Sequence, residues 1–111
     1  MKQLTILEKF AIVVILSRIM RADGIIHPKE EEYMNKVYAE LGIAISDMED
    51  ITNLDYIQAM SIVNKMEKEN KEYACSLFIT MSNADGYIHP LEKLIIDQFH
   101  TTIGICKNQN P

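Results

Sequence analysis

The heptapeptide ADGIIHP, residues 22–28, recurs almost unchanged as ADGYIHP at residues 84–90. Six of the seven letters agree, although 62 positions separate the copies in a chain of 111 residues. In each copy an Asp-Gly pair favours a turn, because glycine tolerates backbone angles that other residues avoid. The proline that ends each copy suits the first position of a helix, where its missing N–H is not needed. The stretch therefore predicts the same helix–turn–helix hinge twice.

The similarity extends well beyond the two heptapeptides. At the same offset, residues 13–43 align with residues 75–105, and apolar positions stay apolar on both sides of each turn. Two copies are too few for a solenoid, which needs at least three repeats. We therefore expect one domain over residues 1–111, built as a pseudo-symmetric duplicated helix–turn–helix with repeat units 13–43 and 75–105.

The helix before the first turn is predicted to be the centre of the core. A capping box at Thr5 and Glu8 starts this helix, which should run to about Arg21. Its FAIVVIL segment, residues 10–16, is apolar nearly all round, as in a helix buried on every side. A membrane span needs about 20 apolar residues, so this segment is too short for one.

Further helices follow from caps and apolar stripes. One should run from Pro28 to Gly42, a short one should start in a capping box at Ser46, and another should start at Asp55. Residues 65–72 look like a charged, solvated junction. A fifth helix would bury Ala74, Leu77, Phe78 and Met81, and a sixth would span residues 90–103. The predicted fold is an all-α compact bundle of about six helices.

Net charge and cysteine content limit the partners and the cellular compartment that we expect for this protein. The net charge of −5 argues against a nucleic-acid partner, which would need a basic face. Cys75 and Cys106 form no disulfide framework or metal motif, and the N-terminus lacks the features of a signal peptide. These observations predict a reduced, cytoplasmic protein.

Each turn matches only half of an EF-hand calcium loop. Asp23, Gly24 and Glu30 fit the fifth, sixth and twelfth loop positions, but the first position would be Ile19, or Met81 in the second copy. Neither side chain offers an oxygen ligand. One turn alone supplies two carboxylates, whereas Ca²⁺ takes about 6–8 oxygens, so a calcium sensor of this type is excluded.

Pooling the two turns gives a richer set of ligands for a divalent cation. If the pseudo-symmetry brings the turns together, their carboxylates and imidazoles form a mixed site that suits Mn²⁺, Zn²⁺ or Fe²⁺ better than Ca²⁺. The candidate metal ligands are Asp23, Glu30, Asp85 and Glu92, together with His27 and His89.

The same residues can also be explained as turn and helix-capping residues, without any ligand. Asp before Gly stabilises a turn through its own side chain, and a Glu at the third helical position reaches back to the cap. An acidic first turn also complements the helix dipole. On sequence alone, capping and cation binding both remain open.

The pattern A-D-G-x-I-x-x-x-E, between an apolar helix and a helix ending in L-G-I, resembles the tellurite-resistance TerB-like family. Residues 22–30 and 41–43 carry the pattern here, and residues 84–92 and 103–105 carry it again with Ile in place of Leu. The resemblance implies an all-helical cytoplasmic domain of bacterial stress-response systems. It further implies acidic turn residues that bind divalent cations, and adaptor roles in larger or membrane-associated complexes. His27 and His89 depart from the usual turn residues.

Two functions follow from these patterns. The first is a non-catalytic stress-response module that binds a divalent cation through its doubled acidic turns. The second is a metal-free helical adaptor that docks a protein partner or self-associates, for which the seven Met and five Tyr residues would supply an adaptable surface. An enzyme is not expected, because the chain has no nucleophile motif, phosphate-binding Gly loop or H-E-x-x-H sequence.

Overall fold

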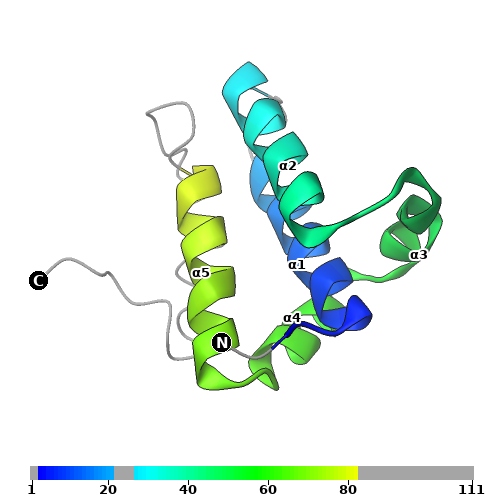
Figure 1. Ribbon diagram of the computed structural model, residues 1–111, viewed down its shortest axis with the longest axis vertical. Helices are drawn as coiled ribbons and strands as arrows, with labels where there is room; N and C mark the ends of the chain where they lie inside the picture. Colours follow the sequence, from blue (N-terminus) through cyan, green and yellow to red (C-terminus); the bar gives the residue numbers. More distant parts are fainter. Residues whose placement is uncertain (1–2, 22–26, 83–111) are drawn as a thin grey trace, which may run out of the picture.

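The computed structural model describes residues 3–21 and 27–82, and this part of the chain is entirely helical (Figure 1). It contains α1 (Ile6–Met20), α2 (Pro28–Leu41), the 3₁₀ helix η1 (Ile45–Asp47), α3 (Met48–Asn53), α4 (Tyr56–Asn64) and α5 (Lys68–Ser82). The all-α prediction is confirmed for these residues. The predicted sixth helix, at residues 90–103, lies outside them, so the six-helix duplicated bundle remains a prediction.

Two of the predicted caps form as reciprocal pairs of hydrogen bonds. The backbone N–H of Glu8 donates to Thr5 Oγ1 at 3.1 Å, and the Thr5 N–H donates to Glu8 Oε1 at 2.9 Å. Asp55 and Gln58 repeat this arrangement at the start of α4, with distances of 2.7 and 3.2 Å. At the other end of α2, Gly42 stops the helix in a left-handed conformation with φ of 70°.

Two local predictions were wrong. Ser46 does not cap a helix, because it lies inside η1, where the Asp47 carboxylate accepts from the Ala44 N–H at 2.8 Å. A short helix does follow, but it begins at Met48. The junction predicted at residues 65–72 is also shorter than expected, since α5 begins at Lys68. Asn70 lies on the buried side of α5 and is only 2% exposed.

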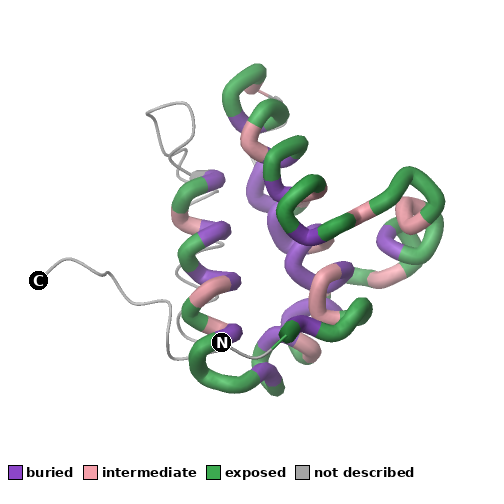
Figure 2. The backbone as a smooth tube through the Cα atoms, viewed as in Figure 1, coloured by how far each residue is buried: buried purple, intermediate pink, exposed green. Residues whose placement is uncertain are grey.

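α1 is the central helix of the described bundle, as its composition predicts. It contacts α2, α3, α4 and α5, and Figure 2 shows it buried along most of its length. Ile12, Ile15, Leu16 and Ile19 are completely buried. Each large apolar side chain contributes about 1.5–3 kcal/mol on burial, so this helix holds the other four together.

α2 and α5 run antiparallel beside α1. The Tyr33 side chain of α2 bonds Thr80 of α5, and the Tyr73 hydroxyl of α5 donates to Glu40 of α2. Tyr33 precedes Glu40 by seven positions in α2, and their partners Thr80 and Tyr73 lie in the reverse order, also seven positions apart, in α5. α1 and α5 therefore end on the side of the bundle where α2 begins (Figure 1). We call this side, marked by Met20, Pro28 and the end of α5, the hinge end.

The described start of the second repeat unit matches the first in burial. Residues 75–81 continue α5 as residues 13–19 continue α1. Four aligned pairs are buried in both helices: Val13 and Cys75, Ile15 and Leu77, Leu16 and Phe78, and Ile19 and Met81. The same set of aligned positions thus faces the core in both helices. Cys75 is the small buried residue that the sequence predicts.

Candidate functional site

The first acidic turn leads into α2 through a helix start that the sequence predicts. His27 is the N-cap residue, with extended backbone angles of −83° and 141°, and Pro28 opens the helix. The backbone N–H of His27 donates to Glu30 Oε1 at 3.4 Å. Glu30 therefore reaches back to the cap residue, so the helix-capping role that the sequence predicts is confirmed for this carboxylate.

Glu30 is nevertheless buried far more deeply than capping requires. Its side chain is 0% exposed, whereas Glu31 and Glu32 beside it are exposed. Glu8 performs the same capping role at the start of α1 while only half-buried. Because removing a carboxylate from water is costly, full burial indicates that the surrounding structure is built to accommodate this group. This burial is the feature of the site that the sequence did not predict.

The remaining predicted ligands cannot be placed beside Glu30. His27 is half-buried on the chain segment that enters α2, while Asp23, Asp85, His89 and Glu92 lie outside the described residues. Within residues 3–21 and 27–82, no group of three or more His, Cys, Asp or Glu side chains converges as metal ligands do. Of the six predicted ligands, the described part of the chain thus holds one carboxylate, Glu30, and one imidazole, His27.

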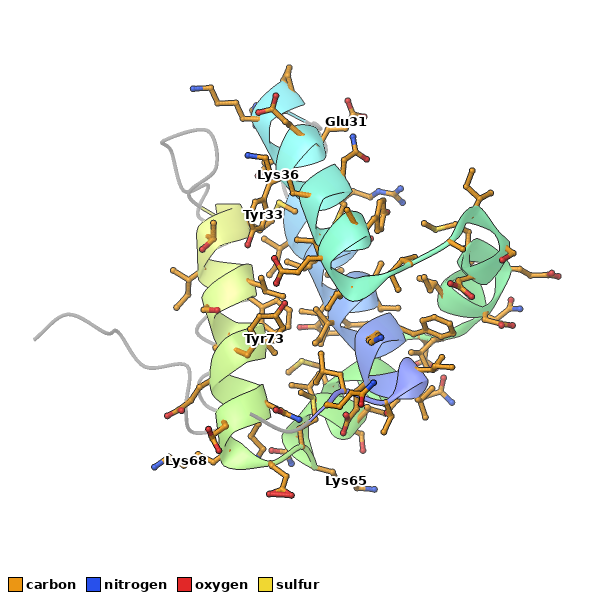
Figure 3. The ribbon with its side chains drawn as sticks, in the orientation of Figure 1. Glu31, Tyr33, Lys36, Lys65, Lys68 and Tyr73 are labelled. Carbon is orange, nitrogen blue, oxygen red and sulfur yellow. The ribbon has the colours of Figure 1, made fainter. Side chains whose placement is uncertain are left out.

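Two tyrosines form polar contacts between α2 and α5, Tyr33 toward the hinge end and Tyr73 toward the opposite end of α2, and Figure 3 shows both lying between these helices. Burial raises the pKa of Tyr33, and its bond to Thr80 partly offsets this rise. Burial, together with the bond to the nearby Glu40 carboxylate, raises the pKa of Tyr73 strongly. These contacts fix how α2 lies against α5. The Tyr73–Glu40 contact spans 33 positions and had no sequence signal.

Two further tyrosines interact with the arginines at the end of α1. The Arg18 guanidinium is 4.6 Å from the centre of the Tyr56 ring, and the Arg21 charge acts on Tyr38. Burial raises the pKa of both tyrosines, and the neighbouring arginine lowers each in part. Sequence reasoning missed this arrangement as well, because Tyr38 and Tyr56 come from two different helices.

Taken as a class, the described chain is an all-helical bundle around one central helix, with a buried capping carboxylate at its hinge end. It is similar to the crystal structure of a protein of unknown function from Porphyromonas gingivalis W83, with a TM-score of 0.75 and 23% sequence identity. That match covers 95% of this chain and 83% of the other. At this identity the likeness concerns the fold alone. No family model and no curated protein matches the sequence.

None of the helices in the described ranges is long and apolar enough to cross a membrane.

Most methionines in the described part of the chain line the core. Among the described residues, Met20, Met34, Met60, Met66 and Met81 are all buried, and Met48 is half-buried against the core. Their role here is therefore to fill the interior, which flexible thioether side chains do well. A methionine-rich docking surface finds no support in this part of the chain.

Proposed function

We infer that this chain is a non-catalytic, cytoplasmic stress-response module of the TerB-like type, which binds a divalent cation at its hinge end. The observation that carries the proposal is the complete burial of Glu30 in the first turn of α2. An exposed carboxylate would cap α2 equally well, as Glu8 caps α1. A divalent cation in contact with this carboxylate, beside the contacts that the carboxylate already makes, would further offset the cost of its burial.

The direction of the helices supports pooling the two turns. The first turn follows α1 directly, and the second begins immediately after α5. Asp85 is three residues beyond Ser82, and a chain of three residues spans at most about 11 Å. α5 ends at the hinge end, so the residues that follow it in the sequence start from the same side of the bundle as α2 (Figure 1).

The proposed ligands divide into two kinds. Glu30, Asp23, Asp85 and Glu92 would supply carboxylate oxygens, and His27 and His89 would supply imidazole nitrogens. Such a mixture favours Mn²⁺, Zn²⁺ or Fe²⁺. The role is structural or regulatory, since a cation held between the two turns would fix the relative positions of two helix pairs.

Thermal melting of the full chain tests this proposal. A metal that binds only the folded state raises the midpoint, and at about 100 times its dissociation constant it adds about 2.7 kcal/mol. We expect Mn²⁺ or Zn²⁺ at millimolar concentration to raise the midpoint, and a chelator to reverse the rise. Glu30→Gln should abolish the effect, whereas Glu31→Gln, at the exposed neighbour, should retain it. No rise with any of these metals, or an equal rise in both variants, overturns the proposal.

A metal-free adaptor is the second candidate, and one observation favours it. Four large apolar side chains are exposed in the described residues, namely Ile6, Leu7, Ile45 and Ile57, with 51–91% of their surface in solvent. Such side chains are costly to expose and are common at docking surfaces. Sedimentation of the chain at increasing concentration distinguishes the candidates, because a self-associating adaptor would form dimers without metal, whereas a cation module would respond to chelator.

A further inference from the structure

The two arginines of this chain lie at the end of α1, Arg18 in its last turn and Arg21 as its C-cap residue. Arg18 and Arg21 are one helical turn apart, and both are exposed. Residues at this spacing have Cβ atoms about 5–6 Å apart on the same face of a helix. In an acidic chain with net charge −5, this pairing concentrates guanidinium groups at one place.

Arg18 is positioned by a tyrosine from another helix, since it lies over the Tyr56 ring of α4 at 4.6 Å. The charge of Arg21 acts on Tyr38 of α2 and lowers the pKa of that tyrosine in part. A guanidinium stacked on an aromatic face keeps its N–H edges available for hydrogen bonds, and its orientation is fixed in advance. Preorganisation of this kind lowers the entropic cost of binding.

Neither guanidinium has a carboxylate partner in the described part of the chain. Residues 3–21 and 27–82 contain many acidic side chains, yet none forms an ion pair with Arg18 or Arg21. Compensation of the α1 dipole explains a positive charge at this position, but a lysine would serve equally well. It does not explain two arginines, one of them stacked on a tyrosine ring.

We propose that Arg18 and Arg21 form a docking surface for an acidic segment of a partner protein, presenting two carboxylates one helical turn apart. Arginine binds carboxylates through two parallel hydrogen bonds, and arginine and tyrosine are both enriched at the energetic centres of interfaces. The spacing of the two guanidiniums matches Glu side chains three or four residues apart on a helix. The surface does not depend on the proposed cation.

The experiment measures binding of a fluorescent, alanine-rich helical peptide carrying Glu at every fourth position, by anisotropy at low salt. The full chain should bind this probe, and a peptide with Lys in place of Glu should not bind. The double variant Arg18→Gln/Arg21→Gln should bind the probe at least about tenfold more weakly than the native chain. Arg18→Lys/Arg21→Lys keeps the charge but loses bidentate bonding, so it should bind several-fold more weakly than the native chain.

A matched control uses a second basic pair near the start of α5, which lies away from the hinge end. Lys65 and Lys68 are also exposed and three residues apart, and Figure 3 shows them away from the hinge end. Lys65→Gln/Lys68→Gln should bind the probe as the native chain does. Circular dichroism and the melting midpoint establish that each variant is folded.

Several results would overturn the proposal. These are no binding of the probe, an equal loss in the lysine control, full affinity in the arginine-to-lysine variant, or displacement of the peptide by inorganic phosphate at low millimolar concentration. Dimerisation that depends on Arg18 and Arg21 would assign the surface to a second copy instead. None of these outcomes bears on metal binding at Glu30, so the two proposals fail separately.

Discussion

The starts of α1 and α2 carry the same local motif in two different environments. In each, a Glu at the third helical position accepts a hydrogen bond from the backbone N–H of the cap residue, at 2.9 Å for Glu8 and 3.4 Å for Glu30. Glu8 is half-buried at the start of α1, away from the hinge end, whereas Glu30 is fully buried at the hinge end. The shorter bond belongs to the less buried residue. Capping alone therefore does not explain where Glu30 lies.

The first prediction compares truncation of these two glutamates. Glu30→Ala should lower the free energy of unfolding by about 2–3 kcal/mol, because it removes a charged hydrogen bond and leaves a buried cavity. Glu8→Ala should lower it by about 0.5–1.5 kcal/mol, since the group lost is partly solvated. Urea unfolding without metal measures both values. Equal losses would mean that burial makes no difference, and the contrast between the two helix starts would disappear.

The second prediction contrasts two tyrosine hydroxyls. Tyr73 donates to Glu40, whereas the Tyr56 hydroxyl is buried without a hydrogen-bond partner among the described residues. Tyr73→Phe should cost about 0.5–1.5 kcal/mol of stability, because a hydrogen bond is lost. Tyr56→Phe should be neutral or stabilising, because it removes an unsatisfied polar group at no loss of packing. Chemical denaturation of the two variants side by side measures the difference, and a larger cost for Tyr56→Phe would contradict the assignment.

The third prediction concerns alkaline pH, where the expected effect is smallest. The pKa of Tyr73 is raised in the folded state, chiefly by burial and by its bond to Glu40. A group whose pKa rises on folding contributes stability that is complete below the unfolded pKa of about 10 and is lost as pH rises above it. Stability should therefore fall above pH 10, and it should fall less steeply in Tyr73→Phe. Unfolding curves between pH 8 and 11 measure the slopes, and identical slopes would exclude this origin.

Much of the fold was predictable from local signals. The caps at Thr5 and Asp55, the stop at Gly42 and the apolar length of α1 each act within a few residues, so the sequence displays them directly. The error at Ser46 has the same local origin. Two overlapping capping patterns compete there, and the Asp47 carboxylate bonds the Ala44 N–H.

The site was predictable only in part, because its distinguishing properties are tertiary. The sequence identifies Glu30 as a candidate ligand or cap, but its burial depends on how α2 packs at the hinge end. The contacts of Arg18 with Tyr56 and of Tyr73 with Glu40 join segments more than 30 residues apart. No periodicity or cap signal encodes such pairs, since they require the relative placement of whole helices.

The central claim, that a divalent cation binds at the hinge end, is tested most directly by paramagnetic broadening of amide resonances with substoichiometric Mn²⁺. The account predicts that the amides of residues 27–31 and of the last turn of α5 broaden first, that those of Lys65 and Lys68 stay sharp, and that Glu30→Gln removes the effect. Uniform weak broadening, or broadening centred on another acidic segment such as residues 67–72, would contradict it.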